Sequence, residues 1–272
     1  MSEIRVNNIT NRDGTAGPSI AGIPVVDSNS HFVVPTGRTG QRYVDGGENI
    51  VRDGLVLYLD AKYSYPGATG TNPDVYTWYD LSGNENHGEL KNGVSYSGTN
   101  GGSLVFDGVD NYATLPINSS LSPVNVTVES WVSNNNLSQY NSFIGGYGDT
   151  AYNGYWLGKG SIYWTFSIGV GGASFKQIQA TAISPNTPTH LVGTFDGSVM
   201  NFYINGGASL FTFNLTGNIA YSGGVVPYVG NITELDSNRF WTGNIFNYKV
   251  YNRALSASEV LQNYEATRSR FQ

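Results

Sequence analysis

The chain of 272 residues contains no cysteine. This absence excludes disulfide bonds, iron–sulfur clusters and thiolate catalysis, because each of them needs a Cys side chain. Charged side chains are also scarce: they make up 12% of the residues, about half of the roughly 25% that is usual in soluble domains. Aromatic residues reach 13% beside this low charge, which argues against a chain that is disordered throughout.

Positive charge and long apolar runs are lacking too. The sequence has 14 Lys and Arg against 20 Asp and Glu, a net charge of -6. Nucleic-acid binders present a basic stripe, so we expect no nucleic-acid partner. No apolar run approaches the ~20 residues of a membrane-spanning helix, and Met1 to Arg5 lack the apolar core of a signal peptide. We therefore expect no membrane insertion and no secretory signal.

The two parts of the sequence differ in pattern. Residues 1–48 carry short apolar runs between Gly and Pro, and so short a segment can hardly offset a backbone ordering cost of about 1–2 kcal/mol per residue by its own burial. We interpret it as an extended arm that orders against another surface, the alternative being a flexible terminus. Residues 49–272 form the second predicted domain.

Short β-branched and aromatic runs alternate with turn residues from residue 50 onward, which predicts an all-β sandwich or barrel. Asn205-Gly206 is a hairpin signal, so 200–204 is expected to pair with 211–215. The predicted strands are 55–59, 103–106, 112–115, 126–132, 161–168, 191–195, 199–204, 211–215 and 245–251. One C-terminal helix is predicted from a capping box, Ser256 to Glu259, followed by the apolar stripe Val260, Leu261 and Tyr264.

Several stretches in this order resemble the laminin-G-like, concanavalin A-like jelly roll over residues 54–272. They are GLVLYLDA (54–61), SYPG (64–67), WYDLSGNENHGEL (78–90), GGSLVFDGVDNYATL (101–115), VTVESWV (126–132), THLVGTFDGS (189–198), FYING (202–206) and GNIFNYKVYNRALSASEV (243–260). The resemblance implies a two-sheet jelly-roll sandwich. It says less about function, because one fold hosts many activities.

The arm carries a second resemblance. IRVNNITNRDGTAGPSIAGIPVV (4–26) and SHFVVPTGRTGQR (30–42) are similar to the N-terminal segments of tailed-phage virion proteins, notably those of cyanophages. The resemblance implies that the arm docks on the particle through other virion proteins while the jelly roll faces outward. It also suggests a homo-oligomer, with a trimer as the working hypothesis. The expected docking residues are Ile4, Val6, Ile9, Ile20, Phe32, Pro35 and Arg38.

Hydrolysis is the first chemistry to test, because glycanases share this sandwich. Glycosidases need two carboxylates roughly 5–9.5 Å apart. The E-x-D-x-x-E strand of the resembling glucanases is missing, and Glu129 has Thr127 and Trp131 as its same-face neighbours. A partner from another strand stays open. The three His residues lack metal-ligand spacing, and we interpret His190 as a half-buried strand residue. We predict no enzymatic activity.

Calcium is the one metal that the sequence suggests, and no other cofactor is expected. The ion takes about 6–8 oxygen ligands, and Asp80, Asp107 and Asp110 lie in turns rich in such oxygens. They are the candidate ligands, although tight turns favour Asp and Asn without any metal.

A glycan site needs an aromatic platform with amide and carboxylate groups beside it. Residues 140–164 hold the densest set, and a second loop, 63–79, is similar in kind. The candidate ligand-binding residues are Tyr147, Asp149, Tyr152, Asn153, Tyr155 and Trp156. Neighbouring glycines favour a loop position for Tyr147 and Tyr152. Packing of these rings in the core or in an oligomer contact is the alternative.

Together the patterns predict a phage virion structural protein, a tail or head fibre or a capsid decoration on the particle surface, whose jelly roll contacts host surface glycans. Two alternatives remain. One is a carbohydrate-binding lectin that is not part of a virion, and the other is a glycan-degrading enzyme.

Overall fold

The computed structural model describes residues 49–64, 76–138, 141–149, 153–171, 175–207, 211–232 and 239–272, with two short strands before them. The chain divides into two units, Met1–Glu48 and Asn49–Gln272, and each is described by itself. In the first unit, β1 (Ser19–Ile20) and β2 (Ile23–Pro24) pair antiparallel, so that the predicted docking residue Ile20 lies opposite Ile23. The other docking residues (Ile4, Val6, Ile9, Phe32, Pro35 and Arg38) lie outside the described residues.

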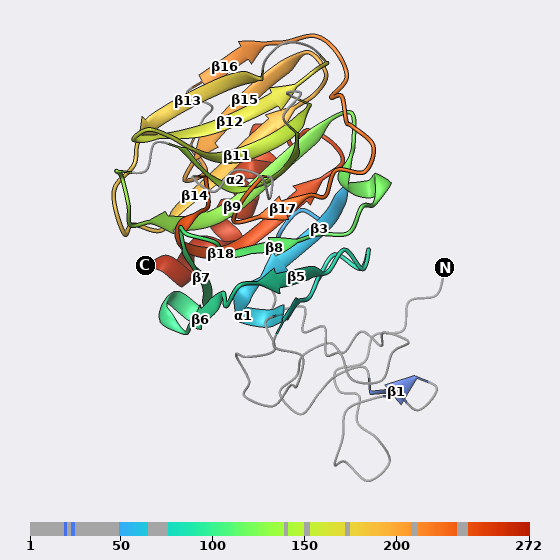
Figure 1. The fold of residues 1–272 in the computed structure, drawn as a ribbon. Coiled ribbons are helices and arrows are strands. Elements are labelled where there is room, and N and C mark those ends of the chain that lie inside the picture. Colours follow the sequence, from blue (N-terminus) through green and yellow to red (C-terminus); the bar gives the residue numbers. More distant parts are fainter. Residues whose placement is uncertain are drawn as a thin grey trace. The chain divides into compact units, whose positions relative to one another are not determined.

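The second unit is a sandwich of two antiparallel sheets (Figure 1). The first, called here the β10 sheet, has the strand order β13-β12-β11-β10-β17-β8-β5-β4. Its strands are β4 (Thr77–Trp78), β5 (Gly88–Lys91), β8 (Tyr112–Thr114), β10 (Asn141–Gly148), β11 (Gly154–Gly160), β12 (Tyr163–Gly169), β13 (Lys176–Ala182) and β17 (Tyr228–Val229).

The second sheet, called the β9 sheet, has the order β16-β15-β14-β9-β18-β7-β6, and β3 pairs with β18 beside this path. Its strands are β3 (Leu55–Asp60), β6 (Ser95–Ser97), β7 (Ser103–Asp107), β9 (Val126–Asn134), β14 (Thr189–Phe195), β15 (Val199–Ile204), β16 (Phe211–Asn214) and β18 (Thr242–Tyr251). Short helices connect some of them: α1 (Ala61–Ser64), η2 (Thr99–Gly101) and η3 (Ser119–Leu121). The all-β two-sheet prediction is confirmed.

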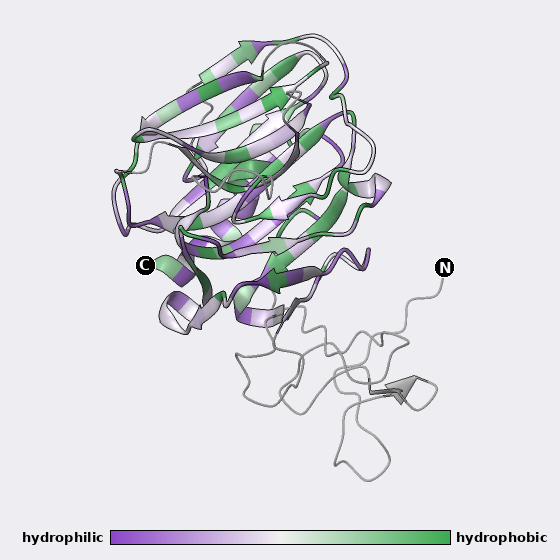
Figure 2. Cartoon of the chain, in the orientation of Figure 1, coloured by the Kyte–Doolittle hydropathy of each residue, from purple (hydrophilic) through white to green (hydrophobic). Residues whose placement is uncertain are grey.

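Strand alternation decides which side chains form the core. In β9, Val126, Val128 and Val132 are buried between the sheets, whereas Glu129 and Trp131 point to the outer face. Figure 2 shows hydrophobic and hydrophilic residues alternating along several strands in the same way. Each fully buried aliphatic side chain stabilises the fold by about 1.5–3 kcal/mol.

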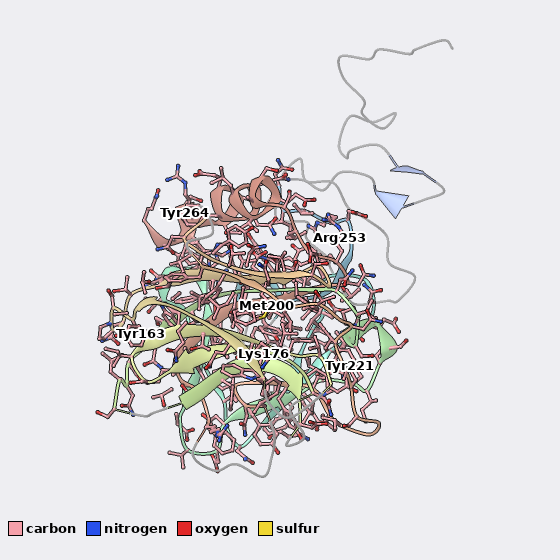
Figure 3. The ribbon with its side chains drawn as sticks, turned by 90° about the horizontal axis from the view of Figure 1, so that it is seen from above. Tyr163, Lys176, Met200, Tyr221, Arg253 and Tyr264 are labelled. Carbon is pink, nitrogen blue, oxygen red and sulfur yellow. The ribbon has the colours of Figure 1, made fainter. Side chains whose placement is uncertain are left out.

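The C-terminal helix α2 (Ala257–Thr267) covers the outer face of the β9 sheet, and η4 (Arg268–Phe271) follows it. In Figure 3 this helix lies at the top of the view with Tyr264 beside it, and Met200 lies between the helix and Lys176 of β13. The capping box is confirmed: Ser256 accepts a hydrogen bond from the Glu259 backbone N–H, and the Glu259 carboxylate accepts one from the Ser256 N–H.

The predicted apolar stripe of this helix is wrong at one position. Leu261 is 46% exposed, while Val260 packs against the sheet and Asn263 and Thr267 are buried. The two polar residues are tolerated there because the sheet offers them partners: the Trp131 indole N–H donates to Thr267 Oγ1 at 2.8 Å. Within the described ranges, no helix is long and apolar enough to cross a membrane.

Candidate functional site

A buried polar cluster lies beneath helix α2 and is centred on Glu129. Lys249 Nζ lies 2.6 Å from Glu129 Oε1, and His190 Nε2 lies 3.1 Å from the same oxygen. Asn263 Nδ2 donates to Glu129 Oε2 at 2.6 Å. All four residues are fully buried. This cluster is called the Glu129 cluster below.

The charges of this cluster follow from its surroundings. Burial alone raises the pKa of Glu129, but Lys249 and His190 outweigh burial and lower that pKa from 4.5 to about 2. Burial lowers the pKa of His190, although the Glu129 carboxylate acts in the opposite direction. Neutral His190 therefore donates from Nε2 to Glu129, and the resting cluster holds one carboxylate paired with one ammonium group.

This arrangement bears on the enzyme alternative. Glu129 is the acid on which a hydrolytic function would depend. Both of its carboxylate oxygens accept hydrogen bonds, however, and helix α2 separates the side chain from solvent. A carboxylate that a sugar cannot reach cannot protonate a glycosidic oxygen. The expectation that His190 is half-buried is wrong, because its side chain is fully buried against Trp131 and Tyr264.

The predicted glycan residues separate into two groups in the structure. Asp149 and Asn153 flank the tip of the β10–β11 hairpin and are half-exposed. The Asn153 backbone N–H donates to Asp149 Oδ1 at 3.1 Å, and Asn153 Nδ2 donates to Asp149 Oδ2 and to Ser222 Oγ, both at 3.0 Å. These three side chains are called the hairpin-tip cluster.

Tyr147 and Tyr155 belong to the core beneath this tip rather than to an exposed platform. They are 5% and 1% exposed and form part of the main hydrophobic cluster. Tyr221 packs against both rings, with centroids 5.0 and 6.3 Å away. The Tyr221 hydroxyl donates a hydrogen bond to the Pro123 carbonyl at 2.8 Å. The predicted loop position of Tyr147 is wrong: the residue lies within β10, and its burial raises the pKa of its hydroxyl.

Trp156 points to the outer face of the β10 sheet, where it forms a small cluster of its own. It is 6% exposed and contacts Phe143, Phe175 and Ile232. The Trp156 and Phe143 rings meet edge to face with centroids 4.7 Å apart. Trp156 thus lies on the other face of its strand from Tyr155, and the two rings form no common platform. The remaining predicted ligand residue, Tyr152, lies outside the described residues.

The carboxylate of Asp80, a predicted calcium ligand, accepts hydrogen bonds from its own loop and from strand β3. Oδ1 accepts from the backbone N–H of Tyr58 at 2.8 Å and of Ser82 at 2.9 Å. Oδ2 accepts from the Ser82 hydroxyl at 2.8 Å and from the Asn86 N–H at 2.9 Å. The carboxylate is fully buried and accepts from four donors. Asp80 therefore holds the loop after β4 against strand β3.

Asp107 and Asp110 lie together in the exposed β7–β8 turn. Asp107 Oδ1 accepts from the N–H groups of Val109, Asp110 and Asn111 at 2.9 to 3.3 Å, which is how a short Asp closes a turn. Among the residues that the structure describes, no group of three or more His, Asp or Glu side chains is arranged to hold a metal ion. The calcium hypothesis gains no support from these turns.

Sequence reasoning missed Ser222, Lys249 and Asn263 as partners in these clusters. Each lies far along the chain from the residue that it contacts, with separations of 69, 120 and 134 positions. Only the strand register brings Lys249 directly opposite Glu129. The capping box at Ser256 and the apolar residues after it placed Asn263 on a helix, but nothing in the sequence linked it to Glu129.

Comparison with known proteins agrees with this architecture. The profile described as "Concanavalin A-like lectin/glucanases superfamily" matches residues 107–261, more than half of the chain. The chain therefore belongs to this laminin-G-like family. Among curated protein sequences, none is similar enough to count as a relative.

Solved structures of low sequence identity share the fold. Domain 4 of the extracellular arabinanase AbnA from Geobacillus stearothermophilus, solved with arabinotriose, superposes with a TM-score of 0.56 at 17% identity over 78% of this chain and 98% of that domain. The binding domain of Paraclostridial Mosquitocidal Protein 1 gives 0.58 at 18% over 78% and 52%. A structure of botulinum neurotoxin type C, whose cell entry depends upon interaction with two ganglioside molecules, gives a TM-score of 0.61 at 14% identity over 80% of this chain and 52% of that chain. The chain spans about half the length of the two toxin structures.

Proposed function

We propose that residues 49–272 form a glycan-binding domain without hydrolytic activity. The observation that carries the proposal is the hairpin-tip cluster: a half-exposed carboxylate and amide held together at the end of a rigid sandwich. Polar groups in a fixed geometry bind sugar hydroxyls well because little freedom is lost on binding. The family and the carbohydrate named with the arabinanase domain add support.

Substitution of Asp149 tests this site. The D149N variant keeps an acceptor for the Asn153 N–H but removes the charge, and D149A removes both. Hydrogen bonds to charged groups are worth about 1.5–3 kcal/mol, so we expect D149A to weaken glycan binding about tenfold or more, with D149N in between. The matched control is Asp110→Ala. Asp110 is also a turn carboxylate, but the pairing of β8 with β17 and of β17 with β10 puts its turn at the opposite end of the sandwich.

Unchanged affinity of a folded D149A protein would remove the hairpin-tip cluster as the site. Weakened binding in both D149A and D110A would indicate a general effect of charge. Binding is measured by calorimetry against host surface polysaccharide fragments, and folding by circular dichroism.

We further propose that the domain is the outward part of a phage virion protein, attached to the particle by residues 1–48. The resemblance of the arm to phage virion segments supports this role. Deletion of residues 1–48 should abolish incorporation into particles while leaving glycan binding intact. Incorporation of the truncated protein at the normal level would overturn the docking role. Absence of the full chain from particles, together with glycan binding, would favour a lectin that is not part of a virion.

Copy number in purified particles locates the protein on the virion. If the protein forms trimers on tail fibres, quantitative mass spectrometry should give a small multiple of three. Hundreds of copies would instead indicate a head decoration.

A further inference from the structure

The Glu129 cluster contains an amine and a carboxamide that both contact one acid–base group, the Glu129 carboxylate. The Lys249 amine lies 2.6 Å from one Glu129 oxygen and the Asn263 carboxamide lies 2.6 Å from the other, so one carboxylate bridges them. We propose that Lys249 and Asn263 join through an isopeptide bond between Nζ and Cγ, with Glu129 transferring the proton. This proposal goes beyond glycan binding and does not depend on it.

Three separate elements fix the reacting groups. Lys249 of β18 is directly opposite Glu129 of β9 in the antiparallel register. Asn263 lies on helix α2, whose start is fixed by the Ser256 capping box. Groups that rigid elements hold beside one carboxylate react faster than free groups in solution, because much of the entropy of bringing them together has been lost during folding.

The Asn263 carboxamide is also polarised. Its Oδ1 accepts a hydrogen bond from the Val51 backbone N–H at 2.7 Å, and its Nδ2 donates to the Tyr251 hydroxyl at 2.9 Å as well as to Glu129. The Val51 N–H therefore points at the oxygen that gains negative charge when an amine adds to Cγ. A backbone N–H in that position stabilises the tetrahedral intermediate as an oxyanion hole does.

The bond-forming step balances without any further reactant. The ammonium group of Lys249 passes a proton to Glu129, and the free amine then adds to Cγ of Asn263. Glu129 next gives that proton to the departing Nδ2, the C–N bond breaks, and ammonia leaves, while the proton that Nζ loses on becoming an amide nitrogen passes to Glu129. The net change converts the Lys249 ammonium, the Glu129 carboxylate and one primary amide into one secondary amide, ammonia and a protonated Glu129, with no oxidation or reduction.

Burial favours this sequence of steps. Helix α2 and η4 cover the cluster, and Trp131 stacks on Phe271 with centroids 4.1 Å apart. In such surroundings, exchange of the proton between Lys249 and Glu129 turns a buried ion pair into two neutral groups. The bond forms once in the lifetime of each chain, so a slow reaction is sufficient.

A second buried lysine provides an internal control. Lys159 Nζ donates to the backbone carbonyls of Asn136 and Ser161 at 2.8 and 3.3 Å. These partners are backbone carbonyls and not a carboxylate or carboxamide side chain, so the same chemistry is not expected there. Lys159 and Lys249 are both buried, but different groups contact their side-chain amines.

Intact-mass and peptide mass spectrometry of the full chain test the proposal. The denatured wild-type protein should be lighter than its sequence mass by one ammonia, about 17 Da. Trypsin should release one branched species in which residues 240–253, uncleaved after Lys249, are joined to residues 254–268. Lys249→Arg and Glu129→Gln should each give the linear mass, whereas Lys159→Arg should keep the loss.

Localisation is needed because cyclisation at an Asn-Gly step also releases ammonia. That loss would persist in Lys249→Arg and would give no branched peptide. Folded wild-type protein that retains its linear mass after prolonged storage, and yields residues 240–249 and 254–268 as separate peptides, would overturn the proposal. The wild-type digest alone decides between the outcomes even if the variants fail to fold.

Discussion

Arg270, in the last turn of the chain, pairs with Asp60 at the end of β3. Arg270 Nη1 lies 2.9 and 3.0 Å from the two carboxylate oxygens, and Asp60 is fully buried. The same guanidinium group donates to the backbone carbonyls of Gly102 and Asn100. One side chain near the C-terminus therefore connects β3 with the η2 segment, and it fixes η4 over the β9 sheet.

Removal of this side chain should lower stability strongly. Arg270→Ala removes a charged partner of the buried Asp60 carboxylate, and loss of one partner of a buried ion pair costs about 3–5 kcal/mol. We expect urea unfolding to show a loss in that range. Arg268→Ala is the control, because the Arg268–Glu265 pair is exposed and should contribute about 1 kcal/mol or less. Equal effects of the two substitutions would contradict this account of Arg270.

The Arg253–Glu259 ion pair should make the free energy of unfolding depend on pH in the acid range. A hydrogen bond from Arg253 lowers the pKa of Glu259 from 4.5 to about 2. Since the folded protein binds this proton less tightly than the unfolded chain, the contribution is complete above about pH 4.5 and is lost as the pH falls towards 2. Glu259→Gln keeps a capping-box residue but should remove this part of the acid sensitivity. Acid titrations that coincide for the two proteins would be inconsistent with this prediction.

Close packing between the sheets leaves no room for a side chain at Gly193 of β14. A Cβ atom at this position would overlap the Phe166 ring. We expect Gly193→Ala to lower the free energy of unfolding by about 1–3 kcal/mol, as overpacking does. Gly98→Ala is the matched control, because nothing lies within 4 Å of its added Cβ and its φ is -75°. A neutral Gly193→Ala would mean that Phe166 moves aside without cost.

Trp156 should contribute to stability rather than to glycan recognition. Its ring is buried among Phe143, Phe175 and Ile232. Trp156→Ala should cost about 3–5 kcal/mol in thermal or urea unfolding, as aromatic truncations in packed sites do. The folded fraction of this variant should bind glycan with wild-type affinity. Loss of glycan binding in Trp156→Ala without loss of stability would instead indicate that the Trp156 ring contacts the glycan.

Strands and the final helix could be predicted because their signals are local. Period-two alternation marked 126–132, and the capping box marked the start of α2. The strand prediction 199–204 matches β15, and the predicted pairing with 211–215 is confirmed as β15 with β16. In these places, propensity, alternation and turn chemistry favour the same structure.

The position of Tyr147 could not be predicted in the same way. Glycines around it suggested a loop, yet Gly146 and Gly148 lie inside β10, where an added Cβ at either would crowd its neighbours. A glycine in the sequence can indicate a turn, or it can indicate a strand position where neighbouring atoms leave no room for a side chain. The sequence alone does not distinguish these two cases. The Glu129 cluster has no local signal at all, because its members meet only through the sheet register and the packing of α2.

The central claim, glycan binding without hydrolysis, is tested most directly by one measurement on the full chain. The protein is incubated with host surface polysaccharide, and bound glycan and newly formed reducing ends are quantified in the same sample. We expect saturable binding, weakened about tenfold or more in Asp149→Ala but not in Asp110→Ala, with reducing ends at the level of the blank. Reducing ends that accumulate with time, or no binding to any host glycan, would contradict it.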